Sequence, residues 1–274
     1  MSFTEHNVNG LIYDTSDVIT AAGSGAVHAF TTRHGGVSPA PYDSLNFADN
    51  KGDTSENLLE NYRLLGEAVG FDASRAVGCR QIHSDLVRIA SEEDAGKILW
   101  DDRPYDADGL ITNVPNLPLF AYGTDCCVIT LYDPTSRSIG AVHAGWRGTV
   151  AQIGRKTVEA MQQSFGSRPE DIVVAIGPSI GQCCYEVDDF VRGKAAGYEQ
   201  FFAPKAAMPG KYLLDLWGYN REVLLNAGLK AENILTAGVC TEHNHEMFCS
   251  YRAEQGKTGR MGVCLYKMSA GKNA

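Results

Sequence analysis

The chain has 274 residues, of which 44% are hydrophobic and 21% are charged, so it is long enough to bury a large core. Its 33 acidic and 24 basic residues give a net charge of −9, which argues against a general nucleic-acid or anionic-membrane surface. No run of the sequence reaches the roughly 18 apolar residues of a membrane span, and the first residues lack the basic and apolar regions of a secretion signal. We therefore expect a cytoplasmic protein whose partners are small molecules.

Apolar and β-branched runs predict nine strands along the chain. In order they cover residues 26–32, 86–90, 117–122, 128–132, 138–143, 172–176, 212–216, 234–240 and 262–266. Three amphipathic helices are predicted between them. The first begins at a capping box of Asp53 and Glu56, the second runs from near Arg147 to Phe165, and the third ends at Gly228. Because strands and helices do not alternate strictly, we expect an α/β or α+β fold in a single domain over residues 1–274.

The eight cysteines are predicted to be reduced. Four of them form the vicinal pairs Cys126-Cys127 and Cys183-Cys184, and Cys240 and Cys264 lie in apolar, strand-like runs. Disulfide frameworks are typical of short secreted chains, and this chain is neither short nor marked for secretion.

The segment from Cys126 to His143 predicts a β-hairpin that ends in a thiol and an imidazole. The apolar run 128–132 is followed by the turn residues 133–136 and by a return strand, so Cys126 and His143 should meet at one end of a sheet. His83, just before another short strand, is a third candidate. A cysteine with two histidines fits an open zinc site, whereas Cys126 with His143 alone fits a thiolate nucleophile and its base.

Short motifs in order along nearly the whole chain carry a resemblance to a known family. They are Thr31-Thr32-Arg33, Gln81-Ile82-His83, Asp106-Ala107-Asp108-Gly109, Thr124-Asp125-Cys126, His143-Ala144-Gly145-Trp146-Arg147-Gly148, Ile176-Gly177-Pro178, Cys183-Cys184-Tyr185-Glu186-Val187, Leu214-Asp215-Leu216, Cys240-Thr241, Ser250-Tyr251-Arg252 and Thr258-Gly259-Arg260. These motifs resemble the YfiH-like laccase-domain family, also called polyphenol oxidase, purine nucleoside phosphorylase or peptidoglycan editing factor. The resemblance implies a single domain of layered mixed β-sheets flanked by helices, similar to the cysteine-hydrolase-like domain of certain deamidating toxins.

The resemblance also implies a site and a reaction. It implies that His83, Cys126 and His143 bind zinc, and that the enzyme phosphorolyses adenosine, inosine or methylthioadenosine and deaminates adenosine hydrolytically. Zinc lowers the pKa of a bound water to about 7, which suits deamination, and arginines suit phosphate because their donors fork. Substrate and phosphate binding would fall on Arg33, Asn46, Arg147, Arg252 and Arg260. Asp125, beside the thiolate, would be a general base or a partner of a ligating histidine.

Besides a non-enzymatic binding module, which an open zinc site among arginines disfavours, two alternative enzymatic functions remain open at this point. In a thiol amidohydrolase, Cys126 would attack and His143 would act as base, with a cell-wall precursor as substrate. In a copper oxidase of phenols, copper would replace zinc at the same three ligands, but seven histidines are too few for paired multicopper motifs.

The sequence departs from the family pattern in two places. Cys127 stands where the family usually has an aliphatic residue, and segment 242–245 is unusually rich in histidine. We interpret this segment as a solvated loop, with an extra metal ligand from His243 or His245 as the alternative.

Overall fold

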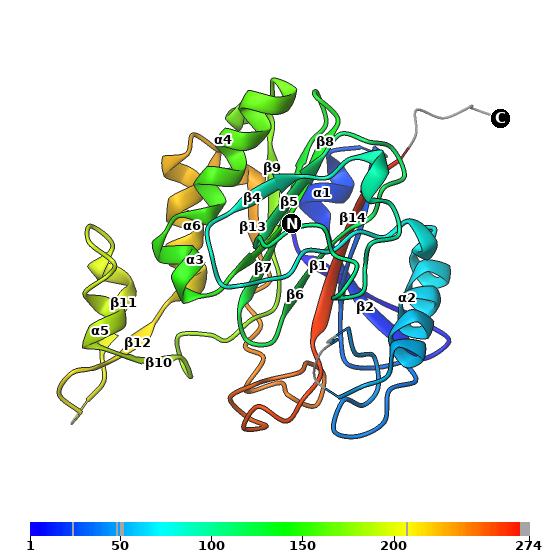
Figure 1. The fold of residues 1–274 in the computed structure, drawn as a ribbon. Helices are drawn as coiled ribbons and strands as arrows, with labels where there is room; N and C mark the ends of the chain where they lie inside the picture. The colour runs from blue at the N-terminus through cyan, green and yellow to red at the C-terminus, as the bar shows by residue number, and fades with distance from the viewer. Residues whose placement is uncertain (24, 48, 50–51, 207, 269–274) are drawn as a thin grey trace.

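The computed structural model describes residues 1–23, 25–47, 49, 52–206 and 208–268 (Figure 1). Its strands are β1 Phe3–Val8, β2 Leu11–Ser16, β3 Ala26–Thr31, β4 Val87–Ile89, β5 Gly109–Thr112, β6 Leu119–Gly123, β7 Cys127–Asp133, β8 Ser138–Ala144, β9 Val173–Ile176, β10 Glu186–Asp188, β11 Phe202–Pro204, β12 Lys211–Leu214, β13 Ile234–Thr236 and β14 Met261–Lys267. The α-helices are α1 Asp17–Ala21, α2 Ser55–Val69, α3 Trp146–Val150, α4 Ile153–Phe165, α5 Asp189–Arg192 and α6 Leu216–Asn226. Short 3₁₀ turns cover Ala73–Arg75, Glu92–Asp94, Pro169–Asp171, Glu199–Phe201 and Ala231–Asn233.

The strands form three sheets. A mixed six-stranded sheet has the order β13-β9-β7-β8-β5-β4, with β7 and β8 at its centre. A five-stranded antiparallel sheet has the order β1-β2-β3-β14-β6, and β10-β12-β11 form a small antiparallel sheet. The predicted fold class, mixed β-sheets flanked by helices, is confirmed.

Alternation of side chains along the central strands produces the layers. In β7, Ile129 and Leu131 pack with α4 and α6 on one face of the large sheet, whereas Val128 and Tyr132 pack against the five-stranded sheet on the other. The outer face of the five-stranded sheet packs on α2 through Phe120. Figure 1 shows the resulting order of helices, sheet, sheet and helix, with the loop between β13 and β14 at the lower end of the sheets.

All nine predicted strands are found, and two of them end two or more residues earlier than predicted. The strand predicted over 234–240 ends at Thr236, because Gly238 takes a left-handed conformation with φ of 67°. The strand predicted over 212–216 ends at Leu214, because the Asp215 carboxylate caps α6 by accepting the Gly218 N–H. Strands β1, β2, β5, β10 and β11 were not predicted. β5, β10 and β11 have only three or four residues, β1 is largely exposed without an apolar pattern, and the apolar residues of β2 are confined to its first half.

The predicted helices need two corrections. The helix predicted from Arg147 to Phe165 is broken into α3 and α4, because Gln152 has a left-handed φ of 59°. Helix α2 is capped by Thr54, whose side chain accepts the Asn57 N–H, and not by the predicted box of Asp53 and Glu56. The third helix was predicted correctly and is α6.

Two further expectations concern the cysteines and membrane crossing. All eight cysteines are unpaired, as predicted. Within the described part of the chain, no helix combines the length and the apolar character needed to cross a bilayer.

Candidate active site

The hairpin of β7 and β8 brings Cys126 to His143. The two strands pair antiparallel, with Cys127 opposite Ala144 and Val128 opposite His143. Cys126 is the residue before β7, and Asp125 before it has a left-handed φ of 72° that turns the chain at this point. The sequence-based expectation that both residues lie at one end of the sheet is therefore met by the strand register.

His83 joins this pair from the loop before β4. One donor atom of each of His83, Cys126 and His143 lies within 4.8 Å of the others. The two imidazole rings are 4.9 Å apart, centroid to centroid, and stand nearly perpendicular at 82°. One sulfur and two nitrogens from three separate segments make a set that zinc enzymes use, with a fourth position left for substrate or water.

Gly145 shows how tightly the chain passes this set. A Cβ atom at this position would lie 2.9 Å from Cys126 Sγ and 3.5 Å from atoms of both His83 and His143. Any side chain there would occupy the space beside the three donor atoms. The residues present therefore fit a small metal ion with sulfur and nitrogen ligands, such as zinc.

Asp108 orients His143, a role that the sequence did not reveal. Its side chain is fully buried, and one carboxylate oxygen lies 2.8 Å from His143 Nδ1. The other oxygen accepts the N–H and the hydroxyl of Ser84, next to His83, at 2.6 and 2.7 Å. With Nδ1–H donating to Asp108, the Nε2 atom of His143 is left with its lone pair for a metal.

Replacing Asp108 with asparagine should lower the affinity of this site for metal by about 10- to 100-fold, as for other partners of ligating histidines. The amide replaces one of the two carboxylate oxygens with an NH2 group, so either His143 or Ser84 loses its acceptor, and the negative charge beside His143 is lost. Competition of the purified variant with a fluorescent zinc chelator measures the change. Asp106→Asn is the matched control, because this exposed carboxylate pairs with Arg80; equal losses in both variants would contradict the assigned role.

In the metal-free protein, Cys126 and His143 form a thiolate–imidazolium pair. Burial would raise the pKa of the Cys126 thiol, but the charges and hydrogen bonds of His143 and His83 lower it to about 6. Burial would likewise lower the pKa of His143, but the Cys126 thiolate and Asp108 raise it to about 9. Between about pH 6 and pH 9, Cys126 and His143 therefore share one proton, which lies on the His143 imidazole.

This pairing sets the pH dependence of metal binding. Ligation needs a thiolate and a neutral imidazole, so an ion binding near pH 7.5 must displace the His143 proton. We expect about one proton released per ion, and an affinity that rises about tenfold per pH unit from pH 6 to 9 and levels off above. Below pH 6 the slope steepens, since Cys126 is then protonated too. Calorimetry in buffers of different ionisation enthalpy measures the protons; heats independent of the buffer would contradict the assignment.

The three donor side chains open into a cavity of about 590 Å³, a volume typical of small-molecule sites. Its wall carries three cationic side chains, Arg252, Lys257 and Arg260, from the loop before β14. Tyr185 and Tyr251 add aromatic surface. The cavity therefore combines a candidate metal position, positive charge and rings.

Arg260 is partly buried, whereas Arg252 and Lys257 are exposed. The Arg260 guanidinium has no hydrogen bond or ion pair to any residue that the structure describes, although burial lowers its pKa. Asn46 does not line the cavity but is fully buried and holds this segment, its side-chain oxygen accepting the Arg260 N–H at 2.9 Å. The Arg252 guanidinium donates two long hydrogen bonds, of 3.4 Å each, to the carbonyls of Cys184 and Glu186.

Two of the arginines from the family motifs lie outside the cavity wall. Arg33 is engaged elsewhere, donating to the His245 carbonyl and pairing with Glu254 at 2.9 Å. Arg147 is exposed and stacks on the Trp146 ring at 4.4 Å. We therefore expect a ligand in the cavity to be bound by other cations than these two arginines.

Asp125 lines the cavity, but both of its carboxylate oxygens have partners. One accepts the Thr241 hydroxyl at 2.6 Å and the other accepts the Arg252 N–H at 2.8 Å. Asp125 therefore ties two parts of the loop between β13 and β14 to the hairpin, and the carboxylate that bonds to His143 is that of Asp108.

Comparisons with known proteins agree with this architecture. The family model described as multi-copper polyphenol oxidoreductase laccase matches residues 27–267. The purine nucleoside phosphorylase YlmD of Bacillus subtilis is 37% identical over 242 residues, 86% of each chain, and a purine nucleoside phosphorylase of Deinococcus radiodurans is 39% identical over 241 residues, 87% of this chain and 88% of that one. The crystal structure of YlmD from Geobacillus stearothermophilus matches with a TM-score of 0.88 at 33% identity, covering 97% of this chain and 99% of that chain.

Proposed function

The chain belongs to the YfiH-like laccase-domain family, and from this premise we propose that it is a zinc-dependent purine nucleoside phosphorylase that also deaminates adenosine. Adenosine, inosine and methylthioadenosine are the proposed substrates. The observation that carries the proposal is one cavity in which the donor set of His83, Cys126 and His143 shares a wall with the unpaired guanidinium of Arg260.

The cationic residues of the wall suit the phosphate. In phosphorolysis a phosphate oxygen forms a bond to the anomeric carbon of the ribose, the bond from that carbon to the purine nitrogen breaks, and the purine leaves with a proton. A dianionic phosphate needs charge-assisted donors, and a partly buried guanidinium without a protein partner supplies them in a forked geometry. Arg260 would bind the phosphate directly, with Arg252 and Lys257 adding positive charge at the exposed side of the cavity.

The aromatic residues suit the base. Tyr251 is 64% exposed although it lies at the cavity, and the Tyr185 ring sits below Arg252 at 5.7 Å from its guanidinium carbon. An exposed ring at the mouth of a cavity offers a stacking surface for a purine. Stacking accepts different purines, which suits the proposed range of nucleosides.

Zinc held by the three donor side chains would supply Lewis acidity, stabilising negative charge that develops on an oxygen beside it. The role of the protein is to hold the three donor side chains rigid. Asp108 fixes the His143 ring, and the hairpin register fixes Cys126 against it. Deamination of adenosine, in which water replaces the amine, needs the same pocket but no phosphate.

A substrate screen with metal-quantified protein tests the proposal. Each nucleoside is incubated with and without phosphate, and the products are separated by chromatography. Free base and the sugar 1-phosphate should form only with phosphate, the sugar being ribose for adenosine and inosine and methylthioribose for methylthioadenosine, and inosine should form from adenosine without phosphate. No turnover of any nucleoside by fully zinc-loaded protein would overturn the proposal.

Zinc is proposed over copper because of where the histidines lie. His6, His28 and His34 bond to Thr15, the Ser16 N–H and the Glu246 carbonyl, far from the donor set in sequence. Within the described residues, no group of three or more metal-binding side chains contains more than two histidines, so paired multicopper motifs have no counterpart. Copper can still occupy the same three ligands, since it outcompetes zinc thermodynamically.

The Cys126–His143 ion pair supports a second candidate function. A thiolate beside an imidazolium is the arrangement of a cysteine amidohydrolase, and a peptidoglycan precursor is the proposed substrate. Metal dependence separates the two functions. A thiol hydrolase would be most active after chelation and inhibited by zinc, whereas a zinc enzyme would lose activity after chelation and recover it on reconstitution.

A further inference from the structure

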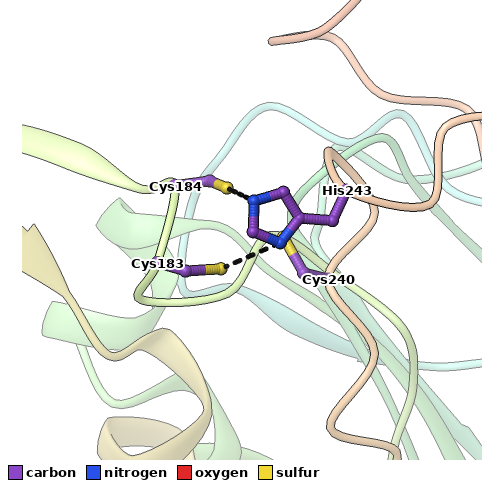
Figure 2. A group of neighbouring side chains, drawn as sticks. All are labelled: Cys183, Cys184, Cys240 and His243. Atoms are coloured by element: carbon purple, nitrogen blue, oxygen red, sulfur yellow. Dashed lines mark hydrogen bonds between the residues drawn. The ribbon is translucent and has the colours of Figure 1, made fainter.

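A second group of metal-binding side chains lies outside the cavity. Figure 2 shows Cys183, Cys184, Cys240 and His243 pointing toward one another, and one donor atom of each lies within 4.8 Å of the others. The His243 ring stands between two sulfurs, with Nε2 3.2 Å from Cys184 Sγ and Nδ1 3.7 Å from Cys183 Sγ. Four ligands around tetrahedral zinc lie roughly 3.5–3.8 Å apart, so the group has nearly this size already.

Neighbouring strands bring the two halves of the group together. The cysteine pair follows β9, and Cys240 and His243 follow β13, which pairs with β9 in parallel. Beyond the strands the pairing continues as a bridge between Ser179 and Cys240. The Ser179 N–H donates to the Val239 carbonyl, and the Thr241 N–H donates to the Ser179 carbonyl. The juxtaposition therefore follows from the sheet and not from flexible side chains.

Each loop is shaped around the sulfur atoms. Both the backbone N–H and the side-chain amide of Asn244 donate to the Cys240 carbonyl, at 3.1 and 2.8 Å, and this turn returns His243 to Cys240. The Gly181 N–H lies 3.3 Å from Cys240 Sγ. A Cβ atom at Gly181 would lie 3.2 Å from Cys183 Sγ and 2.9 Å from the Trp217 ring, so the loop passes the sulfurs where a side chain would collide.

The surroundings also favour a cation. Glu242, between Cys240 and His243 in sequence, has a buried carboxylate oxygen with no hydrogen-bond partner in the part of the chain that the structure describes. Three thiols and a buried carboxylate oxygen gathered from these two loops are costly to ionise without a compensating positive charge. A divalent ion held by thiolates would provide that charge.

We propose that Cys183, Cys184, Cys240 and His243 hold a structural zinc ion. Three sulfurs and one nitrogen form a closed tetrahedral set of the kind found in structural zinc sites. The ion would clamp the loop after β9 to the loop after β13. Ile180 and Tyr185, which flank the cysteine pair, line the cavity, so the clamp would hold one wall of the active site. The proposal does not depend on the reaction assigned to that cavity.

Metal counting in a background without the first donor set tests the proposal. In His83→Ala/Cys126→Ser protein purified without chelators, we expect about one zinc ion per chain by mass spectrometry of the metal. X-ray absorption of this protein should show three sulfurs at about 2.3 Å and one nitrogen at about 2.0–2.1 Å from zinc. Adding Cys183→Ser and Cys184→Ser, or His243→Ala, should bring the zinc content close to zero.

His245→Ala is the matched control. This exposed histidine lies in the same turn, two residues from His243, but its ring contacts the Glu242 carbonyl and the Glu246 carboxylate and belongs to no group of metal-binding side chains among the described residues. The control should retain the zinc that His243→Ala loses. A background protein without zinc, or equal zinc contents in the two histidine variants, would overturn the proposal.

Alkylation of the parent protein gives a test that needs no variant. Cys183 is exposed and should react at once with iodoacetamide if its thiol is free. With zinc bound, Cys183, Cys184 and Cys240 should stay unmodified until a strong chelator is added, as read by peptide mass spectrometry. Immediate modification of Cys183, or a loss of two hydrogens that shows a disulfide among the three, would overturn the proposal.

Discussion

Cys126→Ala should reduce phosphorolysis and deamination of adenosine by more than about 100-fold, because even loss of a residue that only supports a metal ligand costs 10- to 100-fold. The substitution removes the sulfur from the donor set and its negative charge from the cavity, leaving His83 and His143 to hold the ion. Both reactions should fall together, since both depend on this position. Initial rates of each reaction, measured beside the zinc content of the same sample, give the result.

The fold should survive the Cys126 substitution. The core residues around β7, such as Ile129 and Leu131, pack without contribution from the metal position, unlike the core of a zinc finger. Cys127→Ala is the matched control, because the neighbouring thiol points into the core and contacts the Ser179 hydroxyl at 3.2 Å. This control should lose thermal stability but keep activity in the folded protein. Full turnover of adenosine by zinc-free Cys126→Ala protein would refute the metal-dependent reaction.

Strong local patterns made most of the fold predictable. The hairpin of β7 and β8 combines two apolar runs with turn residues between them, and its register then places Cys126 beside His143 without further information. Breaks in regular structure were harder to predict. The left-handed conformations of Gln152 and Gly238 end elements within otherwise continuous patterns, and nothing in the sequence spacing marks them.

The candidate site was predictable to the extent that its residues flank strands. His83, Cys126 and His143 could be proposed together on that ground, and the family motifs added the arginines. The partner of His143 could not be chosen, because Asp125 is adjacent to the thiolate in sequence whereas Asp108 reaches the imidazole only through β5, which pairs with β8. Which carboxylate bonds to a histidine of the site is decided by strand pairing across the sheet and not by adjacency in sequence.

Strand pairing also explains why the group of Cys183, Cys184, Cys240 and His243 could not be predicted from the sequence. The vicinal cysteines and the histidine-rich turn were both visible in the sequence, about sixty residues apart, and no ligand spacing of a zinc finger connects them. They meet because β9 and β13 are parallel neighbours. His243 therefore belongs with these cysteines, and His245 with neither group of ligands.

Arg260→Ala should lower kcat/KM for phosphate by about 10- to 150-fold, which corresponds to loss of a charged hydrogen bond worth about 1.5–3 kcal/mol. The guanidinium lies at the cavity without a protein partner, so its removal breaks no ion pair in the described structure, and the loss should fall on ligand binding. Deamination of adenosine needs no phosphate and should change by only a few fold. Saturation curves in phosphate at fixed inosine, beside deamination rates without phosphate, separate the two effects.

Arg147→Ala is the control for Arg260, and it tests the assignment suggested by the family motif. Arg147 is exposed and stacks on Trp146, so its loss should cost about 0.5–1 kcal/mol of stability and leave phosphate saturation nearly unchanged. Arg260→Lys should recover part of the phosphate affinity, since the charge remains while the forked pair of donors is lost. If Arg147→Ala raised KM for phosphate more than Arg260→Ala, the phosphate would lie outside the cavity. If Arg260→Ala reduced phosphorolysis and deamination equally, its guanidinium would support the metal position instead of binding phosphate.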